Sequence, residues 1–228
     1  MFSNMLEYLE ATADRVPERT AFYDDRETLT YAVLLEAAQR IGSALSETAA
    51  PGSAVALLLD ARSIRNIPAL CGVLYAGCAY APLDISMPPE RLRQLLELLS
   101  PSTILTDERG ERALRQLDFA FSHVLDYGAA AEHSIDKVKL EMIRRHSSVY
   151  DPMSILYTSG STGVPKGSIQ THFSYLHWTQ ATIETYNFDE TVLFGNQSPF
   201  FYANSIIDIF PPVALGATVY LLPAGVLT

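Results

Sequence analysis

The sequence predicts an α/β fold in which largely parallel sheets are flanked by helices. Short apolar segments of strand length alternate with longer segments whose apolar residues recur at helical spacing, which is typical of sheets covered on both faces. Residues 53–59 (SAVALLL) are almost continuously apolar, as expected for a strand buried on both sides. With 228 residues, 48% of them hydrophobic, the chain is long enough to bury a large core.

The first part of the chain alternates helices and strands. Leu34, Ala38 and Ile41 recur at a spacing that places them on one face of a helix. The uncharged residues 66–83 have nearly the length of a membrane span, but their prolines and glycines divide them into a helix, a turn and a strand end. The expected elements are a helix over residues 4–16 capped by Asn4, strands over 20–23 and 28–30 around a polar turn, the helix around 34–45, and the strand of residues 53–59.

The second part of the chain continues this alternation. Pro88 and Pro89 are suited to open a helix, and Leu92, Leu95 and Leu96 then face the core. The remaining expected elements are a strand over residues 103–105, a helix over 108–117, a strand over 123–125, a polar surface segment over 127–148, a strand over 153–157, a helix near 171–186, a strand near 191–194, a helix over 205–210, and a strand over 218–222.

Residues 155–167 (ILYTSGSTGVPKG) predict a phosphate-binding loop. A short apolar strand leads into glycines, which let the backbone approach an anion, and into hydroxyls and a lysine, which donate hydrogen bonds and positive charge. A flexible linker is the alternative, but linkers do not usually follow a buried strand or contain a stiff Val164-Pro165 pair. The predicted residues are Thr158, Ser159, Gly160, Ser161, Thr162, Gly163 and Gly167 as phosphate ligands and Lys166 as the catalytic cation.

The spacing of this loop excludes two common nucleotide-binding motifs. In a Walker loop the lysine follows the last glycine directly, whereas here Lys166 precedes Gly167. The dinucleotide fingerprint also fails, because Gly160 and Gly163 are separated by the wrong distance. Residues 157–167 (YTSGSTGVPKG) instead resemble the phosphate loop of the adenylate-forming (AMP-binding) superfamily. This superfamily includes acyl-CoA synthetases, luciferases and nonribosomal peptide synthetase adenylation domains.

Three further segments strengthen the resemblance to amino-acid-activating domains. Residues 72–84 (GVLYAGCAYAPLD) with 88–99 (PPERLRQLLELL) are similar to the second signature of adenylation domains, and residues 29–45 (LTYAVLLEAAQRIGSAL) to the first. Residues 196–211 (NQSPFFYANSIIDIFP) resemble D-alanine–carrier-protein ligases. The matches span about Thr20 to Leu222 in the family's order, and they imply the large N-terminal subdomain of an adenylate-forming enzyme.

The resemblance implies a two-step reaction with ATP and Mg²⁺. A carboxylic or amino acid attacks the α-phosphorus of ATP, and the acyl-adenylate is then transferred to the phosphopantetheine thiol of an acyl or peptidyl carrier protein. An acyl- or aryl-acid ligase that uses coenzyme A, and a non-catalytic nucleotide-binding remnant, are the alternatives. The family's Mg²⁺ ligand and mobile C-terminal domain have no counterpart in residues 1–228, so we expect an N-terminal portion that is inactive alone.

The resemblance also places the substrate pocket. Tyr202, Ala203, Asn204 and Ile207 are the expected lining residues. In amino-acid-activating relatives an aspartate that binds the substrate ammonium stands where this chain has Ala203. Asp208 is a possible substitute, but helical geometry would turn it away from that position. We therefore expect either a substrate without a free α-amine or a compensating acid elsewhere.

The charge and the remaining polar residues limit the choice of partners. A net charge of −10 argues against nucleic acid and anionic membranes, and a cytoplasmic location is expected. Cys71 and Cys78 match no zinc spacing and are expected to be buried and reduced. His172 and His177 have no nearby ligands at metal-binding spacing, so we predict packing or surface roles and no metal site.

Overall fold

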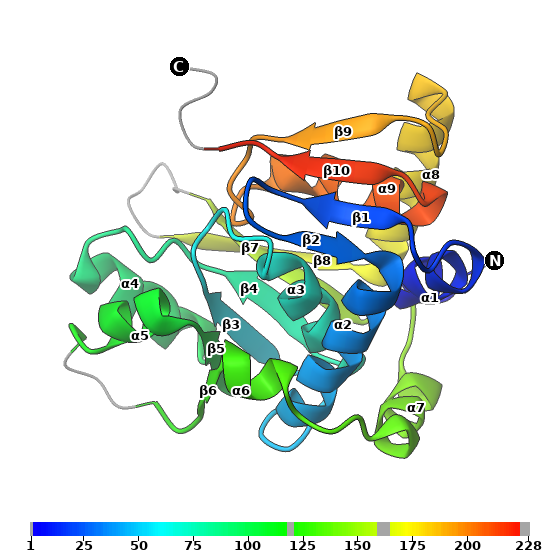
Figure 1. Ribbon diagram of the computed structural model, residues 1–228. Coiled ribbons are helices and arrows are strands. Elements are labelled where there is room, and N and C mark those ends of the chain that lie inside the picture. Colours follow the sequence, from blue (N-terminus) through cyan, green and yellow to red (C-terminus); the bar gives the residue numbers. More distant parts are fainter. Residues whose placement is uncertain (1, 118–120, 159–164, 224–228) are drawn as a thin grey trace.

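The computed structural model describes residues 2–117, 121–158 and 165–223. These residues form two sheets, a four-stranded sheet in the order β2-β1-β10-β9 and a six-stranded sheet in the order β6-β5-β3-β4-β7-β8 (Figure 1). All neighbouring strands are parallel except β1 with β2 and β7 with β8. The predicted α/β class with largely parallel sheets is therefore confirmed.

The helices and strands follow one another along the chain in the order of their labels, with β and α elements intermixed. They are α1 (Leu6–Arg15), β1 (Thr20–Tyr23), β2 (Thr28–Thr30), α2 (Tyr31–Leu45), β3 (Ala54–Leu58), α3 (Asn66–Tyr75), β4 (Ala79–Pro82), α4 (Pro89–Leu99), β5 (Thr103–Thr106), α5 (Glu108–Leu114), β6 (Val124–Asp126), α6 (Tyr127–Ala131), α7 (Lys137–His146), β7 (Pro152–Thr158), β8 (Lys166–Thr171), α8 (His172–Tyr186), β9 (Leu193–Asn196), the 3₁₀ helix η1 (Ala203–Asp208), α9 (Phe210–Leu215) and β10 (Thr218–Leu221).

Helices cover both faces of the six-stranded sheet. Along β3, Val55 and Leu57 belong to the hydrophobic cluster that contains α2 and α3, whereas Ala56 and Leu58 belong to the cluster that contains α4 and α5. This alternation follows from the two-residue period of a strand and explains why the segment has no polar face. All ten residues of α3 are buried, and this helix lies between β2 and β4 (Figure 1).

The four-stranded sheet joins the two ends of the described chain. β1 pairs in parallel with β10, which in turn pairs with β9. The hydroxyl of Tyr31 donates hydrogen bonds to the carbonyls of Pro212 and Ala217, at 3.0 and 2.7 Å, and the Thr12 hydroxyl donates to the Val213 carbonyl at 2.8 Å. These buried bonds fix the N-terminal helices against α9 and β10.

Three parts of the chain differ from the predicted helices and strands. Residues 127–148 contain α6 and α7, and the side chains of Asp126 and Asp136 cap these helices by accepting hydrogen bonds from backbone N–H groups. The segment also contributes to the core, because Leu140 is buried. Strand β8 was not predicted, and the helix expected over residues 205–210 is replaced by η1 and α9.

Several element boundaries also differ from the predictions. The first helix begins at Leu6, although the Asn4 side chain accepts a hydrogen bond from the Leu6 N–H at 2.9 Å. The helix expected over residues 108–117 ends at Leu114. The uncharged residues 66–83 form a helix, a turn and a strand as predicted, and no helix among the described residues has both the length and the apolar character needed to cross a bilayer.

The two cysteines are buried and carry free thiols, as predicted. Burial raises the pKa of the Cys71 thiol to about 12, so this side chain stays protonated and behaves as a small apolar residue. His177 lies at the surface and His172 is buried, in agreement with the packing and surface roles that were predicted.

Because His172 is buried, we expect the free energy of unfolding to depend on pH. Its Nδ1 accepts a hydrogen bond from the Met5 N–H at 3.3 Å, and desolvation lowers its pKa to about 4, although Asp151 opposes this shift. Because the unfolded chain binds this proton at about pH 6.5, the free energy of unfolding should fall as the pH drops from about 6.5 to 4, by up to about 3 kcal/mol.

Urea denaturation across this pH range tests the prediction. The protein with His172→Gln should lose a smaller part of its stability on acidification than the unsubstituted protein, whereas the protein with His177→Gln, a change at an exposed position of the same helix, should not differ. Equal pH dependence of the His172→Gln protein and the unsubstituted protein would contradict the assignment.

Candidate functional site

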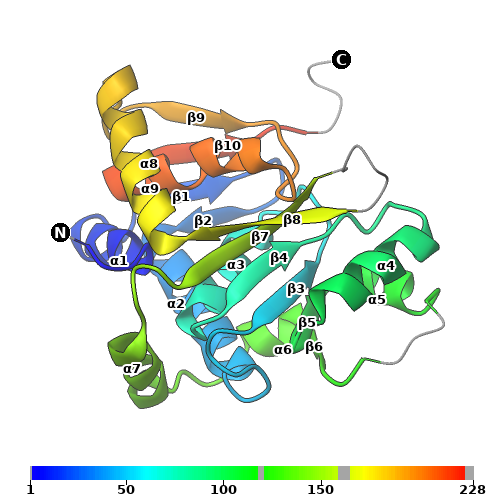
Figure 2. The same cartoon turned by 180° about the vertical axis from the view of Figure 1, so that it is seen from behind.

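The hairpin of β7 and β8 positions the predicted phosphate loop. The strands pair antiparallel, with Thr158 opposite Lys166 and Tyr157 opposite Gly167, so Thr158 and Lys166 lie together at the base of the loop. Ser159, Gly160, Ser161, Thr162 and Gly163 lie outside the described residues. Figure 2 shows β8 at the edge of the six-stranded sheet that is nearest to α8 and α9.

Gly167 is part of a strand and not of the loop. It is not among the described glycines with a positive φ, which are Gly52, Gly77 and Gly216, and its predicted contact with phosphate stays a prediction. A Cβ at Gly167 would lie 3.1 Å from Ile155 Cγ2 and 3.3 Å from Tyr157 Cε1. The glycine instead leaves room for these neighbouring side chains.

Lys166 is an exposed cation at the first position of β8. Within the described parts of the chain, no carboxylate forms an ion pair with its ammonium group. Its charge therefore remains available for an anion bound beside Thr158.

A cavity of about 500 Å³ adjoins the hairpin and α8. It contains Thr158 from the base of the loop together with Ala203, Asn204 and Ile207 from η1. The structure thus brings these predicted residues to one cavity, whereas Tyr202 lies outside it with an exposed side chain packed against Phe201. The lining residues are Leu156, Thr158, Ser168, Gln170, Ser174, Tyr175, Trp178, Ala203, Asn204, Ile206 and Ile207.

Most of the lining residues that sequence reasoning missed come from β8 and α8. Ser168 and Gln170 are two residues apart and therefore share one face of the strand. Tyr175 and Trp178 are three residues apart on α8, a spacing that by itself predicts only core packing. Tyr175 is buried, and its ring contacts Phe210 edge-on at 5.0 Å, but Trp178 is half-buried and lines the cavity.

The cavity walls are mainly apolar and carry little charge. Among the described lining residues, Tyr175 is the only one with a titratable side chain, and burial raises the pKa of its hydroxyl. Its hydroxyl lies 2.8 Å from the Ser154 Oγ. The polar groups that reach the cavity are therefore neutral hydroxyls and amides, which suit a ligand anchored by hydrogen bonds and apolar contact.

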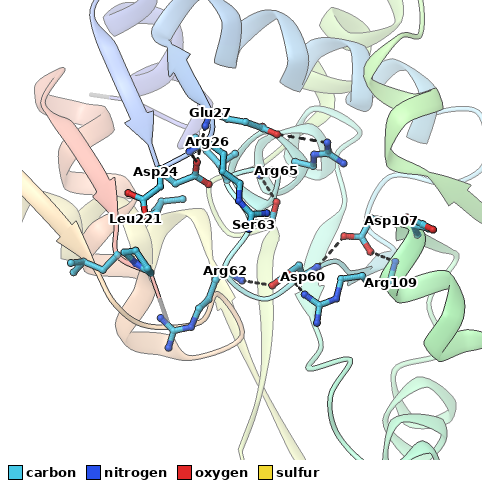
Figure 3. Close-up of a pocket in the computed structure, with 15 residues that line it drawn as sticks. Asp24, Arg26, Glu27, Asp60, Arg62, Ser63, Arg65, Asp107, Arg109 and Leu221 are labelled. Carbon is cyan, nitrogen blue, oxygen red and sulfur yellow. Dashed lines mark hydrogen bonds and ion pairs between the residues drawn. The ribbon is translucent and has the colours of Figure 1, made fainter. Parts of the chain in front are cut away.

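A second cavity, of about 690 Å³, lies at the carboxyl ends of β3 and β5 (Figure 3). The chain order of the strands reverses between β3 and β5, and such switch points often hold ligands in α/β proteins. Here, however, several of the charged side chains already have partners. Asp60 pairs with Arg109, Glu27 lies 3.7 Å from Arg65, and the Arg62 guanidinium donates to a backbone carbonyl at 2.7 Å.

The cavity beside the hairpin is thus the stronger candidate. It combines neutral hydrogen-bonding groups with an apolar wall and includes Thr158, the residue that pairs with Lys166 in the hairpin, whereas the groove at β3 and β5 contains ion pairs between its own side chains. No group of three His, Cys, Asp or Glu side chains within residues 2–117, 121–158 and 165–223 is arranged to hold a metal ion.

Comparison with known proteins links this geometry to a family. The family model described as AMP-binding enzyme matches residues 9–227. The chain is 30% identical over 220 residues to malpinin synthetase of Mortierella alpina, a match that covers 96% of this chain and 3% of that protein. It is 29% identical over 217 residues to the D-alanine–D-alanyl carrier protein ligase of Bacillus velezensis, covering 95% of this chain and 42% of the ligase.

Solved structures show the same relationship. The AMPPNP-bound form of the nonribosomal peptide synthetase FmoA3 is similar with a TM-score of 0.82 and 27% identity, over 97% of this chain and 23% of that chain. The present chain therefore spans less than half the length of each of these three proteins.

Proposed function

The chain belongs to the AMP-binding enzyme family, and on that premise we propose that it takes part in the ATP-dependent activation of a carboxylic acid as an acyl-adenylate. The observation that supports this most directly is the single cavity that joins the base of the predicted phosphate loop, at Thr158, to the predicted substrate residues Ala203, Asn204 and Ile207. A carboxylate and the α-phosphate of ATP must meet at such a junction for the two to react.

In the proposed reaction, a carboxylate oxygen attacks the α-phosphorus, and the bond between this phosphorus and the bridging oxygen of the leaving pyrophosphate breaks. The protein's contribution is to position the reactants and to stabilise negative charge that moves onto pyrophosphate. We assign this role to the Thr158 hydroxyl and the Lys166 ammonium, because the two residues lie opposite each other at the base of the loop. Ser159, Ser161 and Thr162 are proposed as further donors.

The cosubstrates and the acceptor are also proposals. We propose that ATP enters with Mg²⁺, but the described residues offer no acidic cluster for the ion, so no residue is assigned to it. A carrier-protein thiol is the favoured acceptor, because the chain resembles a ligase that is named for its carrier protein. Attack of that thiol on the acyl carbon would release AMP. Coenzyme A is the alternative acceptor.

The test is carboxylate-dependent exchange of labelled pyrophosphate into ATP by the full-length protein, with a panel of amino, hydroxy and aryl acids. Exchange that depends on one acid, and that is lost without ATP or Mg²⁺, is the expected result. ATP turnover that no carboxylate stimulates, or exchange that none supports, would contradict the proposal.

A further inference from the structure

A buried cluster of three hydroxyl groups ties the hairpin of β7 and β8 to its neighbours. The Ser154 Oγ of β7 lies 2.8 Å from the Tyr175 hydroxyl of α8, and the Tyr80 hydroxyl of β4 donates a hydrogen bond to the same Tyr175 oxygen at 3.4 Å. All three side chains are buried. We propose that Tyr175, through this hydroxyl cluster, positions Thr158 and Lys166 for the reaction. The inference rests on the proposed function, because it assumes that these two residues bind the phosphates of ATP.

One face of the hairpin carries both the cluster residue of β7 and the two residues assigned to the phosphates. Side chains directly opposite each other in an antiparallel pair share a face, and so do side chains two residues apart along a strand. The opposite pairs on this face are Ser154 with Gln170, Leu156 with Ser168, and Thr158 with Lys166. Four of these six residues, all but Ser154 and Lys166, line the cavity. Lys166 therefore lies on the strand face that borders the cavity.

The hydroxyl cluster lies where β4 pairs with the hairpin. Within the described chain, the register between β4 and β7 consists of Tyr80 opposite Ser154, and both residues belong to the cluster. Thr158 lies four residues beyond this pair, and β8 pairs only with β7 because it forms the edge of the sheet. The usual rise of a strand puts about 13 Å between Ser154 and Thr158, so a rotation of about 5° at Ser154 would move Thr158 by about 1 Å.

The Tyr175 side chain is itself held firmly enough to set this angle. Its ring contacts Phe210 of α9 edge-on, with 5.0 Å between the ring centroids. A tyrosine hydroxyl both accepts and donates, so the Tyr175 hydroxyl can accept from Tyr80 and donate to Ser154 at the same time. Because this hydroxyl is buried and engaged by two strands, it acts on the phosphate loop through the hairpin and not by contact with a substrate. Tyr175 is thus a positioning residue.

Tyr175→Phe tests the proposal, because it removes the hydroxyl and keeps the ring. With the full-length protein, we expect the maximal rate of carboxylate-dependent pyrophosphate exchange to fall by about 10- to 100-fold, since a misplacement of about 1 Å can cost about 100-fold. The KM for the acid should stay the same, because the hydroxyl does not contact it. Ser154→Ala removes the partner of this hydroxyl and should cause a similar loss. Ser154→Thr keeps a hydroxyl at this position and should retain most of the rate.

A double-mutant cycle distinguishes positioning from a general weakening of the fold. In a Lys166→Ala background, Tyr175→Phe should lower the rate by a clearly smaller factor than in the unsubstituted protein, because one of the groups that it positions is already missing. A general loss of stability would instead lower the rate by the same factor in both backgrounds.

Tyr31→Phe is the matched control. The Tyr31 hydroxyl is also buried and donates two hydrogen bonds, to the carbonyls of Pro212 and Ala217, but none of these three residues is among those that line the cavity. This variant should unfold at lower urea concentration, yet the exchange rate per folded molecule should be unchanged.

Two results would overturn the inference while the proposed function stands. One is an unchanged maximal rate in Ser154→Ala and in Tyr175→Phe, and the other is an equal loss from Tyr175→Phe with and without Lys166. If Tyr175→Phe does not fold, Ser154→Ala and Ser154→Thr decide by the same comparison in the two Lys166 backgrounds. Absence of exchange with every acid in the unsubstituted protein would instead contradict the proposed function, and the inference with it.

Discussion

Replacement of Lys166 by alanine should lower the rate of carboxylate-dependent pyrophosphate exchange by about 100- to 1000-fold, the loss typical when a single preorganised electrostatic donor is removed. Lys166 lies opposite Thr158 at the base of the loop and has no carboxylate partner in the described parts of the chain. The protein as a whole has a net charge of −10, so a local cation is needed to attract and hold a polyphosphate.

Two control variants distinguish the loss of the Lys166 charge from a general loss of folding. Lys166→Arg keeps the charge and should retain more exchange activity than the alanine variant. Lys137→Ala removes an exposed lysine from α7, on a part of the molecule away from the hairpin (Figure 1), and should leave the rate unchanged. Exchange by Lys166→Ala at the unsubstituted rate would show that this lysine does not hold the phosphates.

The second large effect that we expect is a loss of stability when Gly110 is replaced by a residue with a side chain. This glycine lies in the first turn of α5, where the side chain of Asp107 caps the helix. A Cβ at Gly110 would lie 1.8 Å from the carbonyl oxygen of Leu58 and 2.3 Å from the hydroxyl of Thr106. Because the first of these atoms is backbone in the central strand β3, α5 would have to move away from the sheet.

Gly110→Ala should therefore lower the free energy of unfolding by about 3 kcal/mol, the upper part of the range for overpacked cores. Chemical denaturation measures the loss. Gly128→Ala is the matched control, because a Cβ there would meet only the Asp126 side chain, at 3.0 Å. A midpoint for Gly110→Ala equal to that of the control would contradict the close packing of α5 against β3.

Sequence patterns predicted the parts of the fold whose side chains face a core. The strand of residues 53–59 and the helix containing Leu34 and Ile41 are correct because burial dictates their composition. Strand β8 was not predicted, because an edge strand with Ser168 and Gln170 on one face shows no alternation of apolar and polar residues. Its identity depends on pairing with β7, which is a non-local interaction.

The candidate site was only partly predictable for the same reason. Local motifs predicted site residues at 158 and 202–207, and Thr158, Ala203, Asn204 and Ile207 do share a cavity. Trp178 and Gln170 line the same cavity only because of how α8 and β8 pack. No local sequence pattern predicts that packing. The direction of Asp208 depends on η1 being a 3₁₀ helix and on its bond to Asn196, and both follow from tertiary structure.

We expect the acyl-adenylate to bind in the cavity beside the hairpin and not in the charged groove at β3 and β5. Calorimetric titration of an acyl-sulfamoyladenosine against two variants distinguishes these two sites. Ile207→Trp fills the first cavity, and Arg62→Ala removes a cation from the groove. We predict that Ile207→Trp abolishes measurable binding while Arg62→Ala leaves the affinity unchanged. Loss of binding in Arg62→Ala, with full affinity in Ile207→Trp, would contradict the claim.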